Sequence, residues 1–247
     1  LGEWPYSCCN IKLVKGLDEK LYQINIEKGI LRLDNDGLRE CILEPGQSYP
    51  VASQGRYYNQ RGTVYVGLQY QDMGVYGRPI WDAVVTSEYI YAVPVVVIPD
   101  GNEPYLAAAK FKRLEGSALE LATLYDDPLF FNEKVRDNPD LSALREIEVD
   151  SRGDVYVLNT QGLNSSEAFW KYSPNGEVLL GPLELTNSEV ATDPNILAPV
   201  GLCISDDILY LASGRNKDDE PESKVYAFDT TDLSIKGSVT IKDLQHV

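Results

Sequence analysis

Residues 144–180 read LREIEVDSRGDVYVLNTQGLNSSEAFWKYSPNGEVLL, and this stretch decides the expected fold. Apolar and β-branched residues recur in four short segments, at 145–149, 155–158, 168–172 and 177–180. The turn sequences SRGD and SPNG and a polar loop separate them. Period-two alternation interrupted by Gly, Pro, Asn and Asp is typical of an antiparallel meander. The stretch therefore predicts a four-stranded antiparallel sheet.

The same pattern recurs along the chain, in segments at about 10–44, 79–125, 143–185 and 198–242. Each contains a turn followed by a strand with an early tyrosine: LDEKLYQIN (17–25), TSEYIYAVP (86–94), DSRGDVYVL (150–158) and SDDILYLAS (205–213). The matching tyrosines are Tyr22, Tyr91, Tyr156 and Tyr210. One such unit cannot bury both faces of its sheet, so it must stack on copies of itself. Radial stacking of four-stranded sheets makes a β-propeller.

The repeat resembles the β-propellers of the NHL-repeat and SMP-30-like kind. The resemblance rests on these hairpins and on the outer strand pair FWKYSPNGEVL (169–179), which returns as YAFDTTDLSIKG (226–237). It implies one all-β propeller domain over 1–247, with five or six four-stranded blades. Residues 45–78 do not fit the register and are expected to be irregular.

Ring closure in such a fold needs a partner for the last strand. We expect residues 234–241 to complete a sheet with the strand around Ile11 to Val14. This pairing would remove two exposed sheet edges, which are prone to aggregation.

Charge and hydropathy exclude several classes of partner. The chain has 247 residues and a formal net charge of -16. This charge argues against nucleic acid and against an anionic membrane surface. No apolar run approaches the roughly 18 residues that a membrane span needs, so no membrane insertion is expected. The chain begins at Leu1 and shows no signal peptide, which favours a processed or partial chain.

The cysteines and one sequon favour a location outside the cell. We expect Cys8 or Cys9 to form a disulfide with Cys41, and Cys203 to be a free, buried thiol within an apolar strand. Asn164 begins an N-glycosylation sequon on a predicted loop. A processed start and a possible disulfide together favour an extracellular or cell-surface protein.

Histidine-dependent catalysis is not expected. His246 is the sole histidine and lies at the extreme C-terminus. A catalytic triad, a Cys-His pair or a histidine-ligated metal centre would each need more than this single histidine at the chain end. The chain also lacks a phosphate-binding loop and a dinucleotide-binding glycine motif. The sequence therefore favours a protein without catalytic machinery and without a cofactor.

The resemblance also implies an alternative, a calcium-dependent lactonase or hydrolase. SMP-30-like lactonases hold a calcium-type ion at the propeller axis with carboxylate and amide oxygens, which suit a hard cation. The candidate ligands here are Asp82, Glu146, Asp150 and Asn159. Asp150 also fits a turn residue that caps its own backbone. The acidic loop at 213–223 fits a solvated loop better than an ion site.

The tripeptide Arg152, Gly153 and Asp154 spells an integrin-type motif. It lies where the repeat requires a tight turn, and Gly suits a positive φ angle there. Because the other units have different residues at this turn, we interpret the tripeptide as a turn.

Aromatic residues suggest a contact surface. The chain has 16 Tyr against 5 Phe. A platform for sugar rings or a subunit contact is predicted from Tyr49, Tyr57, Tyr58, Tyr65, Tyr70, Tyr76 and Trp81. Ordinary strand packing is the alternative. We therefore expect a binding or self-assembling structural protein at a cell surface, whose partner is a copy of itself, another protein or a glycan.

Overall fold

The computed structural model describes residues 11–25, 28–36, 39–51, 62–66, 80–100, 105–116, 118–126, 144–159, 168–184, 197–215 and 222–242. Within these ranges all the regular secondary structure consists of β-strands. No helix among them has the length and apolar character needed to cross a membrane. The chain divides into two compact units, Leu1–Asn132 and Glu133–Val247, and each is described by itself.

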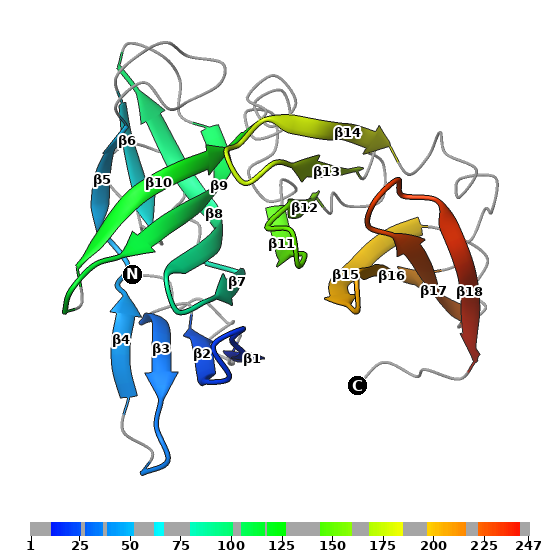
Figure 1. The fold of residues 1–247 in the computed structure, drawn as a ribbon, viewed down its shortest axis with the longest axis horizontal. Coiled ribbons are helices and arrows are strands. Elements are labelled where there is room, and N and C mark those ends of the chain that lie inside the picture. The colour runs from blue at the N-terminus through cyan, green and yellow to red at the C-terminus, as the bar shows by residue number, and fades with distance from the viewer. Residues whose placement is uncertain are drawn as a thin grey trace, which may run out of the picture. The chain divides into compact units, whose positions relative to one another are not determined.

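Sheet A opens the first unit and has four strands in sequence order (Figure 1). They are β1 (Ile11–Lys15), β2 (Leu21–Asn25), β3 (Gly29–Leu33) and β4 (Arg39–Leu43). All pairs are antiparallel, with Tyr22 opposite Val14 and Arg32. These bounds confirm the predicted N-terminal meander.

Sheet B follows and has six strands in the order β10-β9-β8-β6-β5, with β7 also paired to β8. The strands are β5 (Ser48–Val51), β6 (Gly62–Val66), β7 (Asp82–Val85), β8 (Tyr89–Pro99), β9 (Tyr105–Arg113) and β10 (Leu119–Tyr125). Strand β8 has 11 residues. Its first half pairs with β7 and its second half pairs with β6.

The length of β8 explains why residues 45–78 did not fit the repeat. Strands β5 and β6 lie in this segment and extend sheet B rather than forming a blade of their own. The described residues therefore form four sheets, where five or six blades were expected. Sequence periodicity located β6 but not β5, which has only four residues, including Pro50.

A hydrophobic core made of described residues lies between sheets A and B in the first unit. Sheet A contributes residues such as Tyr22, Ile24 and Leu43, and sheet B contributes residues such as Val64 and Phe111. Strands such as β2 and β9 supply these side chains from alternate positions, as expected where one face of a sheet is buried.

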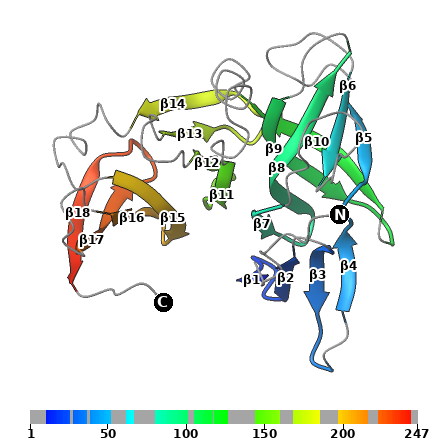
Figure 2. The ribbon, with the colours of Figure 1, turned by 180° about the vertical axis from the view of Figure 1, so that it is seen from behind.

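The second unit contains sheets C and D, each with four antiparallel strands in sequence order (Figures 1 and 2). Sheet C has β11 (Leu144–Val149), β12 (Val155–Asn159), β13 (Ala168–Tyr172) and β14 (Val178–Glu184). Sheet D has β15 (Leu197–Ser205), β16 (Ile208–Arg215), β17 (Glu222–Asp229) and β18 (Ile235–Lys242). Residues 144–180, from which the fold was predicted, thus lie in a single sheet, sheet C.

The expected pairing of the last strand with the first is not among the strand pairs. Strand β18 is the fourth strand of sheet D and pairs with β17, whereas β1 pairs with β2 in sheet A. Both sheets complete their four strands from consecutive hairpins. The predicted exchange of a terminal strand is therefore wrong, because neither sheet lacks a strand.

Sheets C and D pack face to face. Tyr156, Leu158 and Phe169 of sheet C contact a row of sheet D side chains, namely Leu202, Leu209, Leu211, Tyr226 and Phe228. The chain thus has the predicted all-β fold of the β-propeller type. It is built from four-stranded antiparallel meanders, and sheet B has two additional strands, β5 and β6.

Candidate interaction face on sheet D

Two of the four proposed metal ligands, Asp82 and Asp150, pair with basic side chains of the protein. Asp82 is 2% exposed, and its Oδ1 lies 2.7 Å from Lys12 Nζ. Asp150 Oδ2 lies 2.7 Å from Arg152 Nη2. Asn159 is 2% exposed, and its Oδ1 accepts no hydrogen bond. Among the described residues, no group of three or more His, Cys, Asp and Glu side chains is placed to hold a metal ion.

A polar network joins sheet C to the last turn of sheet D. The carbonyl oxygen of Thr230 accepts hydrogen bonds from Tyr156 Oη at 2.9 Å, Arg152 Nη2 at 2.8 Å and Lys171 Nζ at 2.7 Å. Lys171 also forms an ion pair with Asp154 at 3.0 Å. Burial, together with the charge of Asp150, raises the pKa of Tyr156. The network satisfies buried polar groups where the two sheets meet.

An analogous network joins sheets A and B. Tyr22 donates a hydrogen bond from Oη to Asp18 at 2.7 Å, and Arg113 Nη1 lies 3.6 Å from the same carboxylate. Arg113 also donates to the carbonyl of Thr86 at 2.9 Å. In the first network the turn between the last two strands of sheet D contacts Tyr156 itself, whereas in the second Arg113, at the end of β9, contacts Asp18, the hydrogen-bond partner of Tyr22. Two of the repeat tyrosines, Tyr22 and Tyr156, are therefore part of sheet-to-sheet contacts.

The integrin-type tripeptide is confirmed as a turn. Gly153 has a φ of 83°. Arg152 hydrogen-bonds to Asp150 and Thr230, and Asp154 is 9% exposed and paired with Lys171. Arg152 thus contacts sheet D directly, and Asp154 pairs with Lys171, which also contacts Thr230 of sheet D.

The structure describes three of the seven residues of the predicted aromatic platform, namely Tyr49, Tyr65 and Trp81. Tyr49 is a core residue, because its ring packs 4.9 Å from that of Phe111 and only 9% of it is exposed. Burial raises the pKa of Tyr49 to about 12. Tyr65 and Trp81 are half-buried. The remaining members, Tyr57, Tyr58, Tyr70 and Tyr76, lie outside the described residues.

The cysteine predictions have mixed outcomes. Cys203 is free, as expected, but it is exposed rather than buried. The alternation of β15 explains this, because Leu202 faces sheet C and Cys203 therefore faces away. Cys41 forms no disulfide with any residue that the structure describes. Its expected partners, Cys8 and Cys9, and the glycosylation candidate Asn164 lie outside the described residues, so those predictions stand as made.

Sheet D has a second face, turned away from sheet C, which we call the front face. Strand register places two rows of side chains on it. Cys203, Tyr210, Ala227 and Gly237 form one row, and Gly201, Ala212, Val225 and Val239 form the other. Val239 is 64% exposed and Cys203 is exposed, while Tyr210, Ala212, Val225 and Ala227 are half-buried. The front face is thus an accessible apolar surface.

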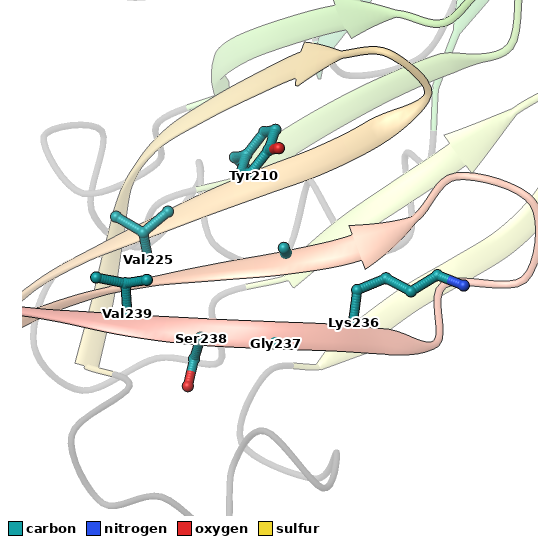
Figure 3. Close-up of a pocket in the computed structure, with 7 residues that line it drawn as sticks. Tyr210, Val225, Lys236, Gly237, Ser238 and Val239 are labelled. Atoms are coloured by element: carbon teal, nitrogen blue, oxygen red, sulfur yellow. The ribbon is translucent and has the colours of Figure 1, made fainter.

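A shallow hollow of about 280 Å³ lies on this front face (Figure 3). Tyr210, Val225 and Val239 project from the same side of the sheet, and the small residues Ala227 and Gly237 form the floor between them. A side chain added at Gly237 would meet no heavy atom within 4 Å. The charge near the hollow is neutralised, because Lys236 Nζ lies 2.9 Å from Asp229 Oδ2. Its chemistry suits an apolar protein surface rather than an ion.

Sequence reasoning missed this face. Tyr210 was identified as a repeat residue, but the sequence pattern gave no sign that it would be more exposed than Tyr22 and Tyr156, which are both 0% exposed.

No protein-family model matches the chain, and no curated protein gives a significant match. Among solved structures, one similar to it is prolyl oligopeptidase B from Galerina marginata, bound to a hydrolysis and macrocyclization substrate, with a TM-score of 0.42 and 11% identity. The alignment covers 95% of this chain but 27% of the peptidase.

A second similar structure is a quinonprotein alcohol dehydrogenase-like protein from Bacteroides thetaiotaomicron, with a TM-score of 0.31 and 12% identity over 96% of this chain and 68% of that one. Because both TM-scores are low, neither likeness carries an argument about function.

Proposed function

We propose that this chain is a non-catalytic binding protein of the β-propeller type that self-assembles through the front face of sheet D. The observation that carries the proposal is the exposed apolar surface around Tyr210, Val225 and Val239. Exposed contiguous apolar surface, rimmed by polar residues, is typical of protein interaction sites. The location at a cell surface rests on the sequence alone.

The distribution of charged groups supports a non-catalytic role. The buried or half-buried acids Asp82, Asp150 and Asp154 pair with Lys12, Arg152 and Lys171. A general acid or base needs a carboxyl group that can reach a substrate in the required protonation state. Each of these carboxylates instead accepts contacts from neighbouring side chains of its own sheet or the next.

Light scattering on the purified chain over a range of concentrations tests the proposal. We expect the particle mass to rise above that of one chain, 27.5 kDa, as the concentration increases. Val239→Asp places a charge on the front face and should weaken self-association by roughly thirtyfold, as expected for a central interface residue.

Leu179→Asp is the matched control. Leu179 is 50% exposed and lies on β14, the fourth strand of sheet C, just as Val239 lies on the fourth strand of sheet D. This variant should associate as the wild type does. A wild-type chain that stays monomeric at every concentration, or a Val239→Asp variant that assembles normally, contradicts the proposal.

A further inference from the structure

We infer that two copies of this chain pair edge to edge through β18, in an antiparallel register with its two-fold axis at Thr240. The inference rests on the proposed self-assembly and adds a contact at the rim of the front face, where Val239 lies. It follows from the exposure of β18, from the direction of its backbone groups, and from the way its sequence matches itself.

Strand β18 lies at the end of sheet D and is exposed along its length. Among the described strands, β18 pairs with β17 alone. It has 8 residues, and every residue from Ser234 to Thr240 is exposed. We call the side turned away from β17 the β18 edge. A long exposed edge offers a row of N–H and C=O groups that another strand can bind, so its fitting partner is a β-strand.

Four other strands at sheet ends carry features that oppose such pairing. Pro50 lies within β5 and Pro182 within β14, and proline has no N–H to donate. The register of β10 shifts within the strand, and such a bulge disrupts the hydrogen-bond ladder. Strand β4 has 5 residues and begins with the charged residues Arg39 and Glu40. In β18, by contrast, the register is regular over 237–242, and this part contains no proline.

Hydrogen bonds at the end of β17 show how its backbone groups alternate. The N–H of Asp229 donates to the carbonyl of Ser234, which directly precedes β18. The N–H of Thr230 donates to the carbonyl of Asp207, which directly precedes β16. Because neighbouring residues of a strand direct their backbone groups to opposite sides, the odd-numbered residues of β17 bond toward β18.

The same alternation fixes the direction of the backbone groups in β18. Val225 is an odd-numbered residue of β17 and lies opposite Val239. Residues opposite one another in a hydrogen-bonded pair exchange both bonds, so Val239 directs its backbone groups to β17. The neighbouring residues, Ser238 and Thr240, therefore direct their N–H and C=O groups to the β18 edge.

The side chains make a second copy of β18 the fitting partner. Residues 238–242 read SVTIK, and their residue classes are nearly symmetric about Thr240. In the proposed register Thr240 lies opposite Thr240 of the second copy, and Val239 lies opposite Ile241. Cross-strand pairs of threonine and of β-branched residues stabilise a sheet. Ser238 lies opposite Lys242, so that no like charges oppose each other.

The two neighbouring registers fit less well. A pair centred on Val239 sets Lys236 of one copy opposite Lys242 of the other, and like charges directly opposite one another destabilise a sheet. A pair centred on Ser238 uses Lys236, where the register of β18 shifts. The register centred on Thr240 uses only the regular part of the strand.

This contact is continuous with the front face of sheet D. Ser238 and Val239 project on opposite sides of β18 (Figure 3), and Ile241 lies on the same side as Val239 by strand alternation. A two-fold axis perpendicular to the sheet keeps the front faces of both copies on one side. The Val239 and Ile241 pairs therefore extend the apolar front face across the contact.

Disulfide cross-linking tests the register, and Thr240→Cys is the informative variant. In the proposed pair the two introduced thiols lie directly opposite, at a Cα separation of about 5.5 Å, which a disulfide can span. Ser238→Cys is the matched control, because Ser238 is also exposed and projects from the same side of β18. Its two copies lie more than about 10 Å apart in this register, too far for a disulfide.

With oxidised glutathione as the oxidant, we expect Thr240→Cys to form a dimer linked through position 240. Mass spectrometry of the digested dimer identifies the linked peptides, which separates this bond from any bond made by the native cysteines. Ser238→Cys should give only the background level. Circular dichroism establishes that each variant is folded. If Thr240→Cys does not fold, a mixture of Val239→Cys and Ile241→Cys replaces it, and the expected product is the mixed dimer.

The failure of the inference differs from the failure of the proposed function. A wild type that assembles, while Thr240→Cys links no more than Ser238→Cys, overturns the inference and leaves the front-face contact standing. That result is also expected if a strand of another protein occupies the β18 edge. A wild type that stays monomeric at every concentration overturns the proposed function, and the inference falls with it.

Discussion

Replacing Lys171 by Met tests whether the polar network between sheets C and D stabilises the fold. Lys171 is 6% exposed, and its Nζ lies 3.0 Å from Asp154 and 2.7 Å from the carbonyl of Thr230. Met keeps most of the side-chain volume, so little cavity forms. The substitution therefore removes the charge and its hydrogen bonds while leaving the apolar packing nearly unchanged.

The size of the effect follows from burial. Removing one partner of a buried ion pair costs about 3–5 kcal/mol, because the other charge is left uncompensated. Here Arg152 Nη2 lies 3.9 Å from Asp154 and offers partial compensation. We therefore expect a loss of about 2–4 kcal/mol in the free energy of unfolding. Adding Asp154→Asn should recover part of this loss, since the unpaired carboxylate is then gone.

Urea denaturation, followed by circular dichroism and by fluorescence of the buried Trp170, measures the loss. Lys236→Met is the matched control, because it removes a lysine of the same sheet pair whose side chain is 50% exposed and pairs with Asp229. Exposed ion pairs contribute little to stability. A Lys171→Met variant no less stable than Lys236→Met would refute the reasoning.

Two further predictions concern pH and calcium. Burial and the hydrogen bond to Asp18 raise the pKa of Tyr22 to about 12, whereas a tyrosine in the unfolded chain titrates near pH 10. Between these values the unfolded chain has released a proton that the folded chain retains, so stability should fall as pH rises from about 10 to 12. Urea midpoints across this range should show a shallower fall in Tyr22→Phe, and an unchanged slope would contradict the assignment. Calcium should shift the melting temperature by less than about 1 °C, because Asp82 and Asp150 already pair with Lys12 and Arg152. A site saturated a hundredfold above its Kd would instead add about 2.7 kcal/mol, and such a shift would favour the lactonase alternative.

Strand positions could be predicted well from the sequence because the meanders are local. Sheets A, C and D each arise from consecutive hairpins, and turn residues such as Gly153 and Gly176, which both have positive φ, mark their ends. Sheet B could not be predicted in full. The strand at 89–98 was predictable, but its second half pairs with β6, more than 25 residues earlier, and no local pattern reports such a non-local pairing.

The candidate site was harder to predict, because exposure depends on tertiary context. Tyr49 and Tyr210 both lie in strands rich in apolar residues, yet Tyr49 packs on Phe111 and Tyr210 lines an open hollow. Similarly, Asp150 as a turn residue was predictable from its neighbours. Its contact with Arg152 is local as well. The convergence of Arg152 and Tyr156 on Thr230 was not predictable, because it brings together residues more than 70 positions apart.

Alkylation of Cys203 tests the central claim most directly, because this thiol lies on the front face of sheet D opposite Tyr210 and is exposed. The measurement is the rate of N-ethylmaleimide labelling of the Cys203 peptide, followed by mass spectrometry at low and high protein concentration. If the front face is the contact surface, the rate falls as the particle mass rises, and it stays constant in Val239→Asp. A wild-type rate that stays constant while the particle mass rises would contradict the account, because association would then use another surface.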